Sequence, residues 1–208
     1  MVGSYADVEE VHWVDQVHGG TVIVVAPRTR RVVPITGSVE TVHAVAAGTG
    51  DALVSGAPTV AVAVLTADCA SIALGSPEGI FGAVHAGWRG LVAGVVEEAV
   101  AAMGSLGATD VVGALGPCIH PECYEFSEPD LDRVAARYGE AVRGRASSGR
   151  PALDLPAAVS AALAGAGVPQ VPGVAACTAC AGNYFSHRAR HDRGRQALVV
   201  WSAGPDPG

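Results

Sequence analysis

Residues 60–90 read VAVAVLTADCASIALGSPEGIFGAVHAGWRG, and this stretch decides the fold class. Two of its runs, 60–66 and 80–84, are apolar, contain β-branched residues and are bounded by Asp, Gly or Pro, which is typical of strands. Both runs are apolar at successive positions, so we expect both faces of the sheet to be covered. Polar residues follow each run: Asp68 and Cys69 come after the first and His85 after the second.

The rest of the chain supplies further strands and a few helices. Strands are expected at 11–14, 21–26, 110–115 and 196–201, and helices at 90–103, 127–138 and 156–164. A surface loop is expected at 144–151 (GRASSGRP) and a frayed tail at the C-terminus. Strands and helices interleave without regular βαβ alternation, and no strand leads into a GxGxxG or P-loop motif. We therefore expect one domain over residues 1–208, of α/β class, in which helices cover a mixed sheet in layers.

Composition narrows the function classes. The chain has 208 residues, of which 50% are apolar and 16% charged, enough for one sizeable core. The 13 basic residues against 20 acidic ones give a net charge of −7, and every basic residue is Arg. Without lysine, Schiff-base, pyridoxal-phosphate and P-loop chemistry are excluded, so anions must be held by Arg, backbone N–H groups or a metal. The acidic balance argues against nucleic acid as a partner.

Compartment and redox state follow from similar reasoning. No apolar run reaches the roughly 18 residues that span a bilayer, and MVGSYADVEE lacks the features of a secretory signal, so we expect a cytoplasmic protein with no membrane partner. The 5 Cys are an odd number for a disulfide framework, so the thiols are interpreted as reduced. The sequence does not indicate the oligomeric state.

Three predicted strand ends carry side chains that could bind a metal or act in catalysis. His18 lies just before the strand at 21–26, Cys69 follows the strand at 60–66, and His85 follows the strand at 80–84. One thiolate and two imidazoles are a ligand set typical of catalytic zinc, with a fourth position open for water or substrate. The alternative for each residue alone is structural: a hydrogen-bonded His at a strand end, or a Cys serving as a small core residue.

Four cysteines form a second candidate cluster. Cys118 and Cys123, together with Cys177 and Cys180 of the CTAC segment, have a spacing compatible with a structural zinc site closed by four thiolates. Packed, metal-free thiols are the alternative. A thioredoxin-like redox pair in CTAC is less favoured because the βαβ context is missing.

An arginine-rich segment forms the third cluster. Arg188, Arg190, Arg193 and Arg195 precede the last strand, where guanidinium groups can hold phosphate or carboxylate, although a solvated loop is the default interpretation of such a run. Arg89 is more specific, because it lies in a Gly-flanked turn that opens the helix expected at 90–103.

Taken together, the motifs identify a family. QVHG (16–19), TADC (66–69), VHAGWRG (84–90), LGPCI (115–119), CYEF (123–126), LDL (153–155), CT (177–178), NYFSHR (183–188) and GRQ (194–196) occur in this order. The chain resembles, from about residue 11 to 201, the bacterial laccase-domain family, first labelled multicopper polyphenol oxidase and now regarded as purine nucleoside phosphorylase with adenosine deaminase side activity.

The resemblance implies a zinc site at His18, Cys69 and His85. It also implies phosphorolysis of adenosine, inosine, guanosine and S-methyl-5′-thioadenosine, and deamination of adenosine to inosine. The implied fold is a layered mixed α/β sandwich like that of a group of cysteine hydrolases that includes a toxin deamidase. Relatives usually carry a longer stretch before QVHG, so we expect a late start or a trimmed member that lacks the substrate contacts of that stretch.

Nucleoside and phosphate are then the small-molecule partners. Our hypothesis is that Arg89, helped by Arg188 or Arg195, holds the phosphate, and that Gln16 contributes to substrate binding. Asp68, next to Cys69, is the candidate for proton transfer in deamination. The usual HxE…PCxxC deaminase signature is missing, so deamination here would be an independent solution.

Other functions stay open. Copper suits the same ligands, but the 7 His include no His-x-His pair of the laccase kind, and neither Met1 nor Met103 is placed as an axial ligand, so copper-dependent phenol oxidation is less favoured than zinc. A second enzyme class is an amide hydrolase for cell-wall precursor editing, with Cys69 as nucleophile and His85 as base. A third reading is a binding or scaffold protein that keeps the fold without activity.

Overall fold

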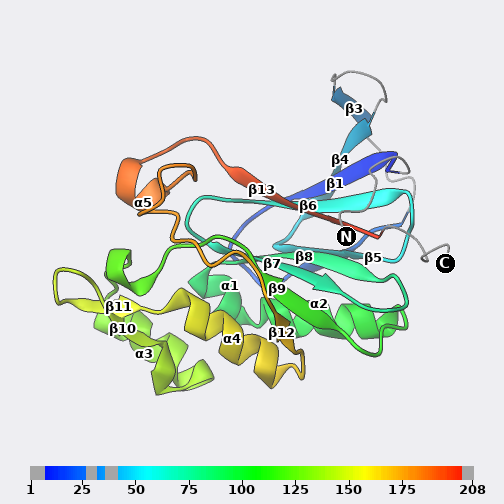
Figure 1. The fold of residues 1–208 in the computed structure, drawn as a ribbon. Coiled ribbons are helices and arrows are strands. Elements are labelled where there is room, and N and C mark those ends of the chain that lie inside the picture. Colours follow the sequence, from blue (N-terminus) through cyan, green and yellow to red (C-terminus); the bar gives the residue numbers. More distant parts are fainter. Residues whose placement is uncertain (1–7, 27–31, 36–41, 203–208) are drawn as a thin grey trace.

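The computed structural model describes residues 8–26, 32–35 and 42–202, so the tail expected to fray lies almost wholly outside it. The described residues form three layers (Figure 1): a five-stranded sheet, a six-stranded sheet packed against it, and most of the helices on the outer face of the second sheet. This arrangement confirms the predicted mixed α/β class.

The five-stranded sheet has the order β13-β6-β1-β4-β3. Its strands are β1 (Glu10–Asp15), β3 (Val32–Ile35), β4 (Val42–Thr49), β6 (Val60–Thr66) and β13 (Gln196–Trp201). β1 runs parallel to both β4 and β6, whereas β13 and β3 pair antiparallel at the two edges. β6 and β13 have the predicted bounds. Strands β3 and β4 were not predicted.

The six-stranded sheet has the order β12-β9-β7-β8-β5-β2. Its strands are β2 (Val22–Val24), β5 (Ala52–Ser55), β7 (Ala70–Gly75), β8 (Phe81–Ala86), β9 (Val112–Leu115) and β12 (Gln170–Val171). β2–β5 and β9–β12 are parallel pairs and the other pairs are antiparallel. The sequence predicts β2, β8 and β9 with shifted ends, but not β5, β7 or β12, which are short or lack alternation.

The helical layer corrects one prediction. The helices are α1 (Trp88–Ala93), α2 (Val95–Ser105), α3 (Glu128–Tyr138), α4 (Leu155–Gly165) and α5 (His187–Arg190), with 3-10 turns η2 (Pro121–Cys123) and η3 (Glu140–Val142). The single helix expected at 90–103 is wrong, because Gly94 takes a left-handed φ of 87° and separates α1 from α2. The capped start of α3 is confirmed: the hydroxyl of Ser127 accepts a hydrogen bond from the N–H of Asp130.

The surface loop expected at 144–151 is also wrong in part. β10 (Arg143–Arg145) and β11 (Pro151–Leu153) pair antiparallel as a hairpin, so that only the residues between them form a turn. Gly149, with a φ of 82°, supplies the left-handed position of that turn. The polar composition of residues 144–151 therefore predicts the turn correctly, but it gives no indication of the two short strands on either side.

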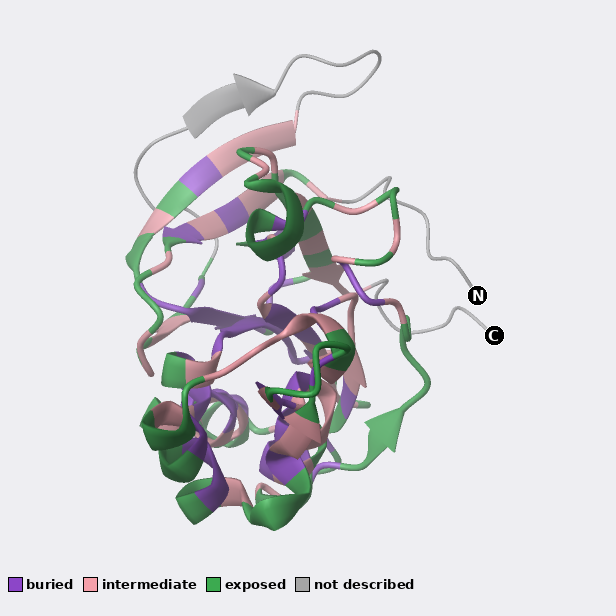
Figure 2. Cartoon of the chain, turned by 90° about the vertical axis from the view of Figure 1, so that its left-hand side faces the viewer, coloured by how far each residue is buried: buried purple, intermediate pink, exposed green. Residues whose placement is uncertain are grey.

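Two cores hold the layers together, and the six-stranded sheet contributes to both. On β5, Ala52 and Val54 face the core shared with the helices, whereas Leu53 faces the core between the sheets. Figure 2 shows buried residues running through the middle layer. The expectation that the sheet is covered on both faces is confirmed for this layer. No helix in the described part of the chain is long and apolar enough to cross a membrane.

Candidate metal centre

The topology brings three separated segments to one end of the two sheets. β1 and β6 are parallel neighbours, so their C-terminal ends lie at the same edge; His18 follows the first and Cys69 follows the second. From Cys69 the chain passes directly into β7 of the other sheet. Ala70 at the start of β7 pairs with Ala86 of β8, which places His85 beside the same edge.

The side chains of His18, Cys69 and His85, the zinc ligands that the family resemblance implies, come together. Their candidate ligand atoms all lie within 4.8 Å of one another. The thiol Sγ of Cys69 is 3.8 Å from Nε2 of His18, and the two imidazole rings meet edge to face with centroids 4.8 Å apart. His85 is buried, Cys69 is half-buried and His18 is exposed. The cluster is therefore open on one side, as a catalytic metal site requires.

Asp51 is the residue that the sequence reasoning missed. Its buried carboxylate accepts a hydrogen bond from Nδ1 of His85 at 2.8 Å and from the backbone N–H groups of His18 at 2.9 Å and Gly19 at 2.6 Å. Carboxylate–imidazole pairs of this kind orient metal-ligating histidines through the ring nitrogen that does not bind the metal. The sequence holds a signal for Asp51, because this residue lies between Gly50 and the short segment ALVS (52–55). Since strand β5 was not predicted there, Asp51 was not recognised as a polar residue at a strand end.

Electrostatics within the cluster favour a thiolate. Burial alone raises the pKa of Cys69, but hydrogen bonds and charge from His18 and His85 outweigh it and lower the pKa to about 7. Burial alone lowers the pKa of His85, yet Asp51 and Cys69 raise it to about 9. Burial raises the pKa of Asp51, and its hydrogen bonds from His85, Gly19 and His18 bring it below the ordinary value. Without a cation, these shifts favour a thiolate–imidazolium pair between Cys69 and His85 as the pH rises above about 7.

Two backbone features shape the cluster for a bound group. His18 has a φ of 60°, a left-handed conformation that is uncommon outside glycine and that Asp51 holds through the His18 N–H. A Cβ on Gly87 would lie 3.0 Å from Cδ2 of His18 and 3.2 Å from Sγ of Cys69, so glycine keeps the space beside the donors clear. The soft donor set, the carboxylate behind it and this free space all fit a zinc-type ion.

The cluster lies in the wall of a pocket of about 650 Å³. This volume is within the range of small-molecule sites. Besides the cluster, its lining residues are Trp13, Val14, Asp15, Gln16, Leu65, Thr66, Ala67, Asp68, Tyr124, His187, Arg188 and Arg195. Aromatic rings and two guanidinium groups therefore share one cavity with the candidate ligands.

Gln16, expected to bind substrate, and Asp68, expected to transfer protons, line this pocket, but their polar atoms are already engaged. The amide of Gln16 donates to the carbonyl of Leu65 and accepts from its N–H, both at 2.8 Å. The carboxylate of Asp68 accepts from the hydroxyl of Thr178 at 2.7 Å and from the backbone N–H of Arg188 at 2.6 Å. These contacts position β6 and the segment that opens α5.

The predicted phosphate-binding arginines lie in different places. Arg188 and Arg195 line the pocket, and the guanidinium of Arg188 lies 5.2 Å from the centre of the Tyr124 ring. Arg89 is an exposed residue of the short helix α1, and its guanidinium lies 4.4 Å from the centre of the Trp88 ring. It is not among the residues that line the pocket. The geometry therefore favours Arg188 and Arg195 for an anion in the pocket.

The cysteine cluster also differs from the prediction in one member. Cys123, Cys177 and Cys180 come together with Glu122, and their candidate ligand atoms all lie within 4.8 Å. Cys118 is buried in the core with only 1% of its surface exposed and is not part of this group. Cys118 is wrong as a ligand because its thiol is not among the donor atoms that come within 4.8 Å of one another.

Fold and centre together define a class: a layered mixed α/β protein with a pocket that carries a His–Cys–His donor set. The family described as multi-copper polyphenol oxidoreductase laccase matches residues 3–203. The chain belongs to this family, which confirms the resemblance inferred from its motifs.

Relatives and solved structures agree with this assignment. The chain is 40% identical over 199 residues to a Streptomyces coelicolor protein named purine nucleoside phosphorylase, covering 94% of this chain and 76% of the relative. A Mycobacterium tuberculosis protein of the same name is 35% identical over 195 residues, covering 92% and 72%.

Among solved structures, a Neisseria meningitidis protein has a TM-score of 0.75 at 28% identity, covering 93% of this chain and 75% of that one. YfiH of Bacillus licheniformis, described as hypothetical, has a TM-score of 0.77 at 22% identity, covering 96% and 76%. The toxin-deamidase likeness implied by the resemblance is not among these neighbours and remains an expectation.

Proposed function

We propose that this protein is a zinc-dependent purine nucleoside phosphorylase, which also deaminates adenosine to inosine. The observation that carries the proposal is that His18, Cys69 and His85 converge in the wall of the same pocket as Arg188 and Arg195. Relatives named purine nucleoside phosphorylase support the reaction class. Adenosine, inosine, guanosine and S-methyl-5′-thioadenosine are the proposed substrates.

His18, Cys69 and His85 would hold the zinc ion, with Asp51 fixing the ring of His85. When bound, such an ion supplies Lewis-acid polarisation of a substrate oxygen or activates water for deamination. Copper is the less favoured alternative, because Met103, the methionine that a copper site would need beside these ligands, is wholly buried in the core of the helical layer, and Met1 lies outside the described residues.

The pocket residues would bind and orient the two substrates. Trp13 and Tyr124 offer aromatic surface for a purine base. Arg188 and Arg195 would hold phosphate through charge-assisted hydrogen bonds and keep it close to the sugar carbon that it attacks. Burial raises the pKa of Tyr124, so that its hydroxyl stays protonated and can donate a hydrogen bond. Asp68 would keep Arg188 in place through the backbone N–H that it accepts.

The decisive experiment measures purine release from inosine and adenosine, with and without phosphate, on protein of known zinc content. We expect phosphate-dependent release of hypoxanthine together with ribose-1-phosphate, and loss of both the activity and one zinc equivalent in Cys69→Ala. Retention of that zinc equivalent by Cys69→Ala would rule out the assigned ligands. Complete inactivity of zinc-loaded protein would favour the binding or scaffold function instead.

Three arginine variants test the phosphate assignment. Arg188→Ala is expected to raise the KM for phosphate by roughly tenfold or more, since a hydrogen bond to a charged group contributes about 1.5–3 kcal/mol. Arg133→Ala on α3 removes the same charge from an exposed site, where the side chain is 66% exposed, and serves as the control. If Arg89→Ala raises the KM for phosphate and Arg188→Ala does not, the phosphate site is on the α1 side, as the sequence alone had suggested.

A Cys–His amide hydrolase is the second candidate, and one observation favours it. Cys69, His85 and Asp51 form a chain of contacts in which the thiol has a pKa of about 7 and the imidazole is oriented by a carboxylate. A chelator separates the two functions: it should abolish the phosphorylase and leave a thiol hydrolase active. Thiol alkylation would inactivate both.

A further inference from the structure

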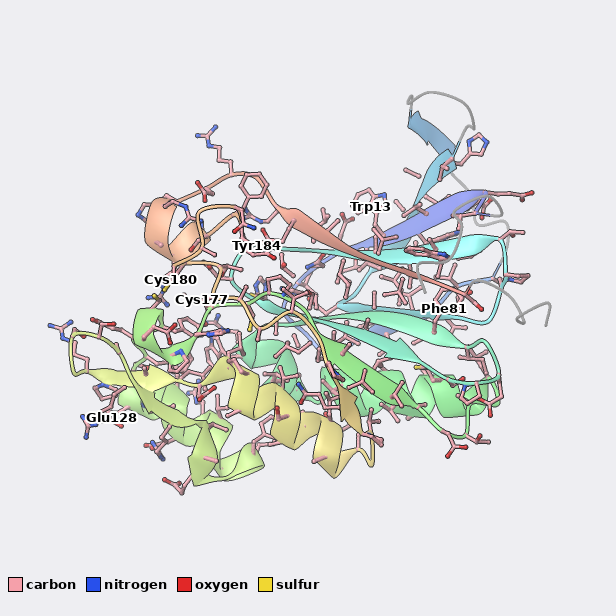
Figure 3. All side chains as sticks on the ribbon, in the orientation of Figure 1. Trp13, Phe81, Glu128, Cys177, Cys180 and Tyr184 are labelled. Atoms are coloured by element: carbon pink, nitrogen blue, oxygen red, sulfur yellow. The ribbon has the colours of Figure 1, made fainter. Side chains whose placement is uncertain are left out.

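Outside the pocket, a second set of soft donors is assembled from two distant segments. Glu122 and Cys123 belong to η2, and Cys177 and Cys180 belong to the turn that follows residue 176. The Sγ atoms of Cys123 and Cys180, 57 positions apart in the sequence, lie 3.1 Å apart, and Sγ of Cys180 is 3.9 Å from a carboxylate oxygen of Glu122. Figure 3 shows Cys177 and Cys180 on the loop beneath α5.

The backbone around this cluster is fixed by hydrogen bonds that do not involve the donor atoms. The N–H of Thr178 donates to the carbonyl of Cys118 at 3.1 Å, within an isolated parallel bridge between Cys118 and Cys177. The guanidinium of Arg190 donates to the carbonyls of Thr178, Ala179 and Tyr184, which holds the turn. The donor positions are therefore set in advance by main-chain contacts.

The donors themselves have the chemistry of a closed metal site. A Cys-x-x-Cys turn places two thiols on one side of a loop, and η2 supplies a third thiol and a carboxylate. The backbone N–H of His120 points at Sγ of Cys177 at 3.4 Å, a contact that stabilises a thiolate. Sulfur atoms about 2.3 Å from a tetrahedral zinc ion lie about 3.8 Å apart, so Sγ of Cys123 and Sγ of Cys180, which are 3.1 Å apart here, would separate by a few tenths of an ångström on binding the ion.

The 3.1 Å contact between Sγ of Cys123 and Sγ of Cys180 shows that these donors are packed directly against one another. Arg190 does not neutralise them, because its guanidinium donates to carbonyl groups and to Asp192. A divalent cation would displace the thiol protons and bind the resulting thiolates.

We propose that Glu122, Cys123, Cys177 and Cys180 bind a second, structural metal ion, zinc by preference. Four protein ligands leave no open position, which distinguishes this site from the centre in the pocket. The ion would tie the exposed segment before α5 to η2. Tyr124 directly follows Cys123, and its ring lies under Arg188, so the site would hold one wall of the pocket in place.

Zinc stoichiometry tests the proposal without any activity measurement. Protein prepared with Zn²⁺ as the added metal is expected to contain two zinc equivalents per chain. Cys180→Ser and Cys123→Ser should each retain one, at His18, Cys69 and His85. Cys69→Ser should also retain one, at the new site, and the Cys69→Ser, Cys180→Ser double variant should retain none. Cys118→Ala, a cysteine outside the donor set, is the matched control and should keep both.

Cobalt substitution distinguishes the two sites by spectrum. Three thiolates give intense thiolate-to-cobalt charge-transfer absorption, which should persist in Cys69→Ser and fall in Cys180→Ser to the weaker band that the single thiolate of Cys69 gives. A parent protein with one zinc equivalent that disappears in Cys69→Ser would overturn the proposal. So would a titration of the unfolded protein that finds three free thiols instead of five, since Cys123 and Cys180 would then be joined as a disulfide. The cobalt titration of the parent remains decisive even if a serine variant fails to fold.

Discussion

Cys69 lies between two imidazoles at the point where the chain passes from one sheet to the other, and this position controls its ionisation. Because its pKa is lowered from 9.0 to about 7, about half of the thiol is ionised at pH 7 in the metal-free protein, against about one part in a hundred for an unperturbed thiol. Thiolate reactivity therefore reports directly on the geometry of the centre.

We predict that alkylation of Cys69 in metal-free protein rises with pH around a midpoint near 7, and that His18→Ala moves the midpoint upward. Removing the imidazole takes away a hydrogen bond that lowers the pKa. Site-resolved mass spectrometry of iodoacetamide-treated protein measures the rate. Cys123, whose pKa is raised to about 12, is the internal comparison and should react much more slowly at neutral pH. Equal rates at the two thiols would contradict the predicted ionisation.

Asp51 is a positioning residue, and its contribution can be separated from that of the ligands. Asp51→Asn keeps the shape but removes the charge that orients His85 and one acceptor for the loop at His18. Zinc affinity is expected to fall about 10–100-fold, as is typical when a histidine ligand loses its carboxylate partner. Competition with a chromophoric chelator in a Cys180→Ser background measures this one site. Asp110→Asn, an exposed aspartate before β9, should leave the affinity unchanged.

At the scale of elements, the junction of α1 and α2 decides how the chain leaves the metal centre. A helical stripe runs through 90–103, but Gly94 adopts a φ of 87°, and its N–H caps α1 through the carbonyl of Leu91. Apolar residues before and after Gly94 are buried against the same sheet, so the apolar periodicity continues across the interruption. Periodicity alone therefore predicts a single helix.

Gly94→Ala is expected to lower the free energy of unfolding by about 1–2 kcal/mol, the cost of a left-handed conformation for a residue with a Cβ. Gly104→Ala in α2 meets no neighbouring atom within 4 Å and should instead raise the free energy of unfolding by about 0.5–1 kcal/mol. Urea unfolding of both variants measures the difference. A stabilising Gly94→Ala would mean that α1 and α2 can merge into one helix.

At the scale of the whole molecule, the two sheets share the metal centre. His18 follows a strand of the five-stranded sheet, His85 lies in the six-stranded sheet, and Cys69 connects them. Packing between the sheets must therefore set the distances among the ligands. The core between the six-stranded sheet and the helices contributes to stability, but it does not lie between the two sheets that carry the ligands.

Two core truncations separate these effects. Leu53→Ala, in the core between the sheets, is expected to reduce both the free energy of unfolding, by about 2–5 kcal/mol, and zinc affinity. Leu163→Ala, equally buried in the helical core, should cost a similar amount of stability with a smaller effect on zinc affinity. Denaturant unfolding and zinc competition give the two values. Equal losses of affinity in both variants would contradict the dependence on sheet-to-sheet packing.

The sequence by itself determined the fold class and the three ligand candidates of the centre. Apolar runs such as 60–66 predict strands because backbone periodicity and burial are local properties of the chain. Polar residues at the ends of those runs, Cys69 and His85 among them, are recognisable because strand ends can present side chains without loss of core.

The tertiary structure alone decided which of these residues meet. Asp51 became part of the centre through the register of β5 with β8, where the N–H of His85 donates to the carbonyl of Asp51, and no local pattern specifies that pairing. Likewise, Glu122 replaced Cys118 in the second cluster, and Arg188 rather than Arg89 lines the pocket. Strand pairing and packing between layers bring together residues that are far apart in the chain. The distances between such residues are fixed only when the chain folds, so a single sequence does not show them.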